Sequence, residues 1–366
     1  MNKYFVFAVI ILLSFSLYAK EYALYYTIND SLKIGLTGTP YFSYTSESGL
    51  GLGLTFILYE RSDTKTQVYG QDFNMRFGGD MTMDGEYEMS IRTSIPLRKY
   101  QQRIRLDTEY KKKSREYNGI GGNTTNENPL SFLNEHYKFQ GIWEKNLRKD
   151  VKIGIAWDYS GQKNIHENQN YKDNIEYPIG FDKFYRTAGI GPLFIITTKN
   201  PNNFPTNGIY YENKLLFYDE KISSNYNFTI WMQEFQIFIP IDNHVIANQI
   251  ISHNAFNNIP FHYYPQQGSS TMMRGYQSGR FLDEQFLGIQ SEYRSPIIFS
   301  RISAVAFAAS AISYKGISDF REQNIHFTGG FGFRFALDKK ERVNARADIG
   351  FSEEGYQLYL KFGEAF

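Results

Sequence analysis

The sequence has no cysteine and almost no net charge, and each of these absences excludes a class of protein. Without cysteine there is no disulfide framework, thiolate zinc site, iron–sulfur cluster, thiol nucleophile or lipid-modified N-terminal cysteine. The 39 Lys and Arg residues balance 38 Asp and Glu residues, which excludes a global electrostatic attraction to nucleic acid. We therefore expect no nucleic-acid partner and no cofactor.

Long apolar runs are also missing beyond the N-terminal region, and the mean hydropathy is −0.45. These features exclude a helical membrane protein. They do not exclude a membrane barrel, because a barrel strand alternates apolar with polar residues and so averages to a hydrophilic score. Aromatic side chains are abundant instead: 31 Phe, 29 Tyr and 3 Trp make up 17% of the chain, which argues against disorder.

The N-terminus has the pattern of a secretory signal peptide. The basic start Met1-Asn2-Lys3 precedes an apolar run over 4–17, and Ala19 stands before the charged pair Lys20-Glu21. The run is too short and too rich in serine for a comfortable membrane-spanning helix. We expect export and cleavage after Ala19. An uncleaved N-terminal anchor is the alternative.

Alternation with a period of two recurs along the rest of the chain. In 343–351, for example, every second residue is apolar, and the residues between them include Asn344, Arg346 and Asp348. Such alternation predicts strands with one apolar and one polar face. A soluble sandwich also alternates, but in an outer-membrane barrel the apolar face meets lipid and the charged face lines the lumen. We count sixteen strands, an even number as a single-chain bacterial barrel requires: 31–44, 50–60, 66–79, 85–97, 101–112, 134–146, 150–160, 186–199, 207–219, 225–240, 243–256, 283–296, 299–314, 323–337, 342–352 and 355–366.

The lengths of the connections follow the same plan. The even-numbered connections are short, whereas the long ones all have odd numbers and span 113–133, 161–185, 257–282 and 315–322. Short turns on one side and long loops on the other are typical of periplasmic turns and extracellular loops. A soluble sandwich has no reason to sort its loops in this way. The sequence therefore predicts an all-β transmembrane barrel over 31–366, after a signal peptide (1–19) and a short periplasmic segment (20–30).

The end of the chain reads as a final strand. Residues 356, 358, 360 and 362 are apolar and the sequence stops at Phe366, although Glu364 breaks the alternation. A last strand with a terminal aromatic residue resembles the C-terminal recognition signal of bacterial outer-membrane barrels. A buried C-terminal strand of a soluble sandwich is the alternative for this segment alone.

One long connection carries a motif. It contains Met273-Arg274-Gly275-Tyr276, and the strand after it places Glu292 on the polar face. The pattern resembles the BamA/TamA superfamily of sixteen-stranded outer-membrane barrels, also called bacterial surface antigen barrels. The resemblance implies that the sixth outer loop, 257–282, folds into the lumen, where Arg274, Gly275 and Tyr276 form its tip. Glu292 is then the acidic partner of Arg274 on the inner wall.

Other segments extend the resemblance over nearly the whole mature chain. Residues 40–51 resemble the family's opening strand and first loop, 189–208 its central hairpin, and 330–366 its last three strands, with Arg346 and Asp348 as the penultimate-strand motif. Two departures stand out. The stretch 306–310 lacks the second inward aspartate of the family, which leaves Glu292 as the expected single acidic partner. The interval between the signal peptide and the first strand has no room for periplasmic POTRA domains.

Two functions fit this barrel, and neither is enzymatic. The resemblance implies a factor for assembling or translocating outer-membrane polypeptides, with client polypeptides as partners. A pore or surface-exposed barrel without insertase activity is the alternative. Under both, the partners include outer-membrane lipid, lipopolysaccharide, and the periplasmic chaperones and barrel assembly machinery needed for the chain's own insertion. The histidines show no metal-ligand spacing, so we expect no metal site.

Overall fold

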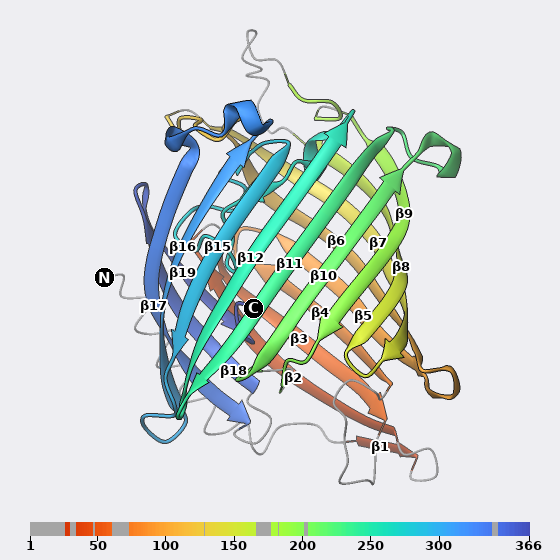
Figure 1. Cartoon of the computed structure of the whole chain (residues 1–366), viewed down its shortest axis with the longest axis vertical. Helices are drawn as coiled ribbons and strands as arrows, with labels where there is room; N and C mark the ends of the chain where they lie inside the picture. Colours follow the sequence, from red (N-terminus) through yellow and green to blue (C-terminus); the bar gives the residue numbers. More distant parts are fainter. Residues whose placement is uncertain are drawn as a thin grey trace.

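The computed structural model describes residues 26–29, 34–46, 48–60, 73–127, 129–165, 177–181, 183–200, 204–338 and 343–366. Sixteen strands pair in sequence order, each antiparallel to the next, and the last of them pairs with the first to close the sheet. The strands run obliquely around the resulting barrel (Figure 1). The sixteen-stranded antiparallel barrel predicted from the alternation is confirmed.

The barrel strands have the following bounds: β2 Ile34–Thr45, β3 Gly49–Glu60, β4 Asn74–Thr82, β5 Tyr87–Leu97, β6 Gln102–Tyr117, β7 Leu130–Arg148, β8 Val151–Ile165, β9 Tyr185–Thr197, β10 Gly208–Tyr218, β11 Phe228–Ile241, β12 His244–Asn257, β15 Gln285–Arg294, β16 Ile302–Tyr314, β17 Ile325–Asp338, β18 Val343–Ser352 and β19 Gly355–Phe362. The first part of the expected strand 66–79 and the expected signal peptide lie outside the described residues.

The remaining elements are short. β1 (Tyr26–Asn29) pairs with the start of β2, and β13 (Gln266–Gln267) pairs with β14 (Phe281–Leu282) within the connection between β12 and β15. Short 3-10 turns occupy several connections: η2 Arg98–Tyr100, η3 Glu220–Ile222, η4 Phe261–Tyr263, η5 Ile317–Asp319 and η6 Glu322–Asn324. Among the described residues, no helix is long and apolar enough to span a membrane.

The two faces of the sheet differ in exposure and polarity, as β15 illustrates. Leu287, Ile289 and Tyr293 are 36%, 53% and 40% exposed, whereas Gln290 and Glu292 between them are 2% and 0% exposed. Exposing apolar surface to water costs a free energy of about 25 cal/mol per Å². An apolar exposed face around a closed barrel therefore suits lipid, and the polar side chains line the interior.

Strands β6 and β7 extend further than the sequence predicted, to Tyr117 and back to residue 130. The extension is stabilised by an aromatic cluster at its end. The rings of Tyr117 and Phe132 lie 5.4 and 5.7 Å from that of Phe261, which belongs to the connection between β12 and β15. Phe181 completes the cluster from the connection after β8. Contacts between remote loops thus lengthen these strands.

The last strand is shorter than predicted. β19 ends at Phe362, and Gly363 follows with a φ of +80°, a left-handed conformation that suits glycine. Residues 363–366 leave the sheet, and Phe366 packs against Phe238 and Val245 on the buried faces of β11 and β12. The expected strand 355–366 is therefore wrong over its last four residues. The interpretation of Phe366 as a recognition signal stays a prediction.

Candidate functional site: a buried charge cluster beside the barrel seam

Arg274 lies in the sixth-loop segment, defined here as residues 258–284 between β12 and β15. Its side chain is fully buried and donates to Glu292 of β15 at 2.7 Å and to Asp348 of β18 at 2.9 Å. The guanidinium carbon also lies 3.5 Å from the centre of the Phe307 ring on β16. One side chain of the loop thereby contacts three separate strands. A buried arginine needs such partners, because an unpaired charge in a dry interior is costly.

Glycines allow the loop backbone to approach the sheet this closely. Gly275 has a φ of +124°, and a Cβ on it would stand 2.8 Å from the backbone of Phe351. Gly350 faces it from β18, where a Cβ would stand 2.4 Å from the carbonyl oxygen of Arg274. Any larger residue at either position would push the loop away from β18. The two glycines therefore determine how deeply Arg274 reaches toward its carboxylates.

The partners of Arg274 belong to a larger charge cluster. Glu292 also accepts from Arg294 at 2.9 Å, and Asp348 also accepts from Arg346 at 3.0 Å. Arg334 lies between the two carboxylates, 2.5 Å from Asp348 and 3.6 Å from Glu292. Each of these side chains is at most 3% exposed. The complete charge cluster consists of Arg274, Glu292, Arg294, Arg334, Arg346, Asp348 and Glu364.

The structure brings several predicted site residues together. Arg274, Glu292, Arg346 and Asp348 share one cluster, although the sequence had connected only the first two. The expectation of a single acidic partner for Arg274 is wrong, since Asp348 supplies the second carboxylate. It comes from β18 rather than from the stretch 306–310, because the loop tip lies against β18 through the paired glycines.

Sequence reasoning missed Arg294, Arg334 and Glu364 as members of the cluster. Arg334 is on the polar face of its strand, as its alternation indicated, but its partner was not evident. Glu364 lies two residues beyond the end of β19. It accepts from Arg334 at 2.7 Å and from Asn344 at 2.7 Å. The break in alternation at Glu364 was the available signal.

The loop tip also binds the last strand. The backbone N–H of Gly275 donates to the hydroxyl of Tyr359 on β19 at 3.1 Å, and that hydroxyl donates to the carbonyl of Tyr276 at 3.3 Å. The hydroxyl of Tyr276 donates to Glu353, in the turn between β18 and β19, at 2.9 Å. Hydrogen bonds from His326 and Tyr276 lower the pKa of Glu353, while burial raises the pKa of Tyr276.

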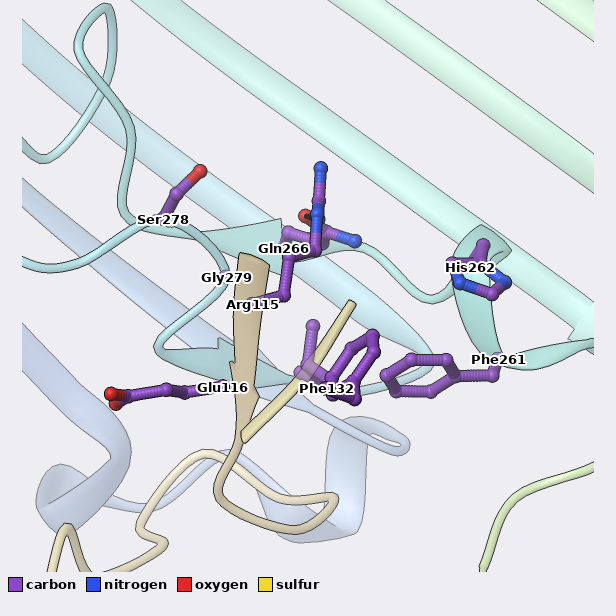
Figure 2. A pocket seen from close by; sticks show the side chains of 9 residues that line it. Arg115, Glu116, Phe132, Phe261, His262, Gln266, Ser278 and Gly279 are labelled. Carbon is purple, nitrogen blue, oxygen red and sulfur yellow. Dashed lines mark hydrogen bonds between the residues drawn. The ribbon is translucent and has the colours of Figure 1, made fainter. Parts of the chain in front are cut away.

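A second set of contacts anchors the start of the sixth-loop segment to the opposite side of the barrel. His262 lies 2.9 Å from Asn164 and 2.7 Å from the hydroxyl of Tyr185, and Tyr263 donates to Asp158 at 2.6 Å. Burial lowers the pKa of His262 well below its usual range. Figure 2 shows the hollow beside it. The residues that line the hollow come from this segment, β6 and β7: Arg115, Glu116, Phe132, Phe261, His262, Gln266, Ser278, Gly279 and Leu282.

The barrel closes at a short seam next to the loop tip. Among the described residues, β19 and β2 are registered over two pairs, Tyr359 with Thr45 and Leu360 with Tyr44. Every other neighbouring pair of barrel strands is registered over at least seven pairs, the number found between β9 and β10. The described part of the chain holds no group of three or more His, Asp or Glu residues arranged to bind a metal ion.

Comparison with solved structures identifies this fold. BamA from Haemophilus ducreyi lacking POTRA domains 1–3 superposes with a TM-score of 0.62 at 11% identity, over 93% of this chain and 74% of that one. CdiB from Escherichia coli gives 0.60 at 9% identity, over 92% and 64%. CdiB from Acinetobacter baumannii gives 0.57 at 6% identity, over 91% and 60%.

The chain thus spans less than two thirds of either CdiB chain. No protein-family model and no curated protein matches its sequence. At these identities the likeness concerns the fold alone. In its fold, the chain is a closed sixteen-stranded barrel of the BamA type.

Proposed function

We propose that the chain acts in the outer membrane as a factor that inserts or exports polypeptides, and that it does so at the seam between β19 and β2. The support is the short ladder at that seam, with two registered pairs against at least seven elsewhere. Each backbone hydrogen bond contributes about 0.5–1.5 kcal/mol net. The seam is therefore where the least backbone pairing has to break, and an opened strand edge can pair with an incoming strand.

In this proposal the sixth-loop segment folds into the lumen and braces one side of the seam. Arg274 connects the loop tip to β15 and β18, and Gly275 and Tyr276 bind Tyr359 of β19. With β18 and β19 held from inside, opening the seam displaces β2 rather than the braced strands. Arg274 and its carboxylate partners then have a structural role.

A pore or surface role is the second candidate, and one observation favours it. On the polar faces of β5 and β6, the side chains of Arg92 and Asp107 are 53% and 42% exposed and that of Arg105 is 39% exposed, in contrast to the dry charge cluster. Wetted charges of both signs suit an aqueous passage. A barrel that conducts ions and affects no other protein would have this second function.

We also propose that the chain reaches the outer membrane by export, with 1–19 removed as a signal peptide. Its environment would then include lipid, lipopolysaccharide and the periplasmic chaperones and assembly machinery that insert barrels. The apolar exposed face of the strands supports a lipid environment. The proposed role is transport of polypeptides rather than catalysis.

The absence of cysteine allows a sharp test of the seam. Tyr44→Cys combined with Leu360→Cys places two thiols on a registered cross-strand pair, whose Cα separation in an antiparallel ladder is compatible with a disulfide. Oxidation should lower the levels of other outer-membrane barrels in cells that depend on this chain, and reduction should restore them. The matched control is Phe56→Cys with Phe77→Cys, a registered pair of β3 and β4 away from the seam.

Two results would reject parts of this proposal. If depletion of the chain leaves the level of every other outer-membrane protein unchanged, the assembly role fails. If oxidation of the seam pair and of the control pair changes the levels of other outer-membrane barrels equally, the seam is not where polypeptides are inserted or exported. Conductance in planar bilayers is measured in parallel, and its complete absence would reject the open pore.

A further inference from the structure

The last four residues form a strap across the barrel interior. Gly363 directs the chain out of β19, and Phe366 contacts β11, β12 and β15, which lie on another part of the wall. Two anchors hold the strap. Glu364 accepts from Arg334 and Asn344, each at 2.7 Å, and the main-chain oxygen of Phe366 accepts from Arg294 at 3.0 Å.

The residues around Phe366 form a pocket for an aromatic side chain. The guanidinium carbon of Arg294 lies 5.2 Å from the ring of Phe366, 5.3 Å from that of Phe204 and 5.6 Å from that of Phe238. Val245, 4% exposed, and Ala247, fully buried, close the apolar side of the pocket. A cation surrounded by aromatic rings attracts their faces, and Glu292 holds that cation in place at 2.9 Å.

The pocket and the two anchors together specify a short pattern. An acidic residue binds Arg334 and Asn344, and an aromatic residue two positions later fills the Arg294 pocket and presents its main-chain oxygen to the guanidinium. These contacts involve residues 364 and 366, and the side chains of residues 363 and 365 take no part in them. The pattern is thus a property of the wall, and this chain's own tail is one segment that satisfies it.

We propose that this wall is a receptor site for extended peptide segments with an acidic residue two positions before an aromatic residue, and that residues 363–366 occupy it reversibly. The strap continues directly from β19, whose ladder to β2 has two registered pairs. Displacement of the strap by a second segment of the same chemistry releases the end of β19 from the interior. The pocket would bind such segments whether or not client polypeptides pass through the seam.

Peptide binding to the purified barrel tests this site. The probe is a fluorescent synthetic peptide with the sequence of residues 357–366, and the matched controls replace its last Phe by Ala or its Glu by Gln. A barrel that ends at residue 362 should bind the parent peptide at least tenfold more tightly than either control peptide. The full-length barrel should bind the parent peptide at least tenfold more weakly than the shortened one, because its own strap competes.

Two substitutions complete the test. Phe238→Ala in the shortened barrel should remove the preference for the aromatic peptide, whereas Phe333→Ala, which changes an exposed residue on the outer face, should not. If the shortened barrel does not fold, the full-length Phe366→Ala variant empties the pocket and serves in its place. Equal binding of the Phe-ended and Ala-ended peptides, or an unchanged preference in Phe238→Ala, overturns the proposal.

Discussion

The charge cluster makes a quantitative prediction about Arg274→Ala. The cluster contains four arginines and three carboxylates, so the substitution leaves three of each. Glu292 still accepts from Arg294, and Asp348 still accepts from Arg334 and Arg346. Breaking a buried ion pair typically costs about 3–5 kcal/mol. Since both carboxylates keep a partner, we expect a loss of about 3 kcal/mol in the free energy of unfolding, at the lower end of that range.

Glu292→Gln should cost more than Arg274→Ala. It removes the acidic partner of Arg294 and one of the two acidic partners of Arg274, and it leaves four arginines facing two carboxylates. We expect a loss of about 5 kcal/mol in the free energy of unfolding, at the upper end of the range for a broken buried ion pair. Both values follow from counting which charges remain paired in a dry interior, where a charge without a partner is penalised most.

Urea unfolding of the purified barrel in detergent micelles measures these losses, and Arg280→Ala is the control. Arg280 belongs to the same loop and is also buried, at 2% exposure, and it donates to Thr124 at 2.6 and 3.0 Å. Its one acidic partner is Glu354 at 2.6 Å, whose side chain is 24% exposed. Because that carboxylate is partly in water, we expect a smaller loss for Arg280→Ala than for Arg274→Ala, whose two acidic partners are both fully buried. Equal losses for Arg274→Ala and Arg280→Ala would refute the special role of Arg274. A smaller loss for Glu292→Gln than for Arg274→Ala would refute the charge count.

Three further predictions concern the loop tip, its pH dependence and the outer face. Gly275→Ala should destabilise the barrel by more than Gly355→Ala. Both glycines have φ near +124°, but only at Gly275 would an added Cβ stand 2.8 Å from neighbouring backbone. Thermal unfolding compares the two variants, and equal shifts in the unfolding temperature would exclude the clash. The pKa of Glu353 is lowered in the folded state, so its ionised carboxylate stabilises the fold above its ordinary pKa of about 4.3, and this stabilisation is lost as the pH falls. Glu353→Gln should therefore flatten the acid part of the curve of unfolding free energy against pH. An unchanged curve would refute the assignment. The side chain of Leu52 is 57% exposed. If that face meets lipid, Leu52→Arg should make the free energy of insertion into lipid vesicles less favourable by about 2–4 kcal/mol, whereas Leu52→Phe should leave it unchanged. Full insertion of Leu52→Arg would contradict the orientation of β3.

The architecture was largely predictable because a barrel strand has a strong local pattern. In 343–351 the apolar and polar residues alternate, and the structure places them on opposite faces of β18 as expected. The strand number followed from repeating the same reading along the chain. The ends of strands were less predictable. β6 and β7 are extended by aromatic contacts between separate loops, and β19 ends early because Glu364 and Phe366 find partners on other strands.

The sequence by itself determined the number of strands and, along most of each strand, the face on which a side chain lies. These features depend on residues that are close in the chain, so periodicity is enough to reveal them. The acidic partner of Arg274 was expected only from the resemblance of its loop motif to the BamA/TamA barrels. Only the tertiary structure decided which charges meet. Arg274 and Asp348 are 74 residues apart, and closing the sheet brings β15, β17, β18 and the loop tip to one place. The short seam has the same origin, because the pairing of the last strand with the first depends on the closure of the whole barrel.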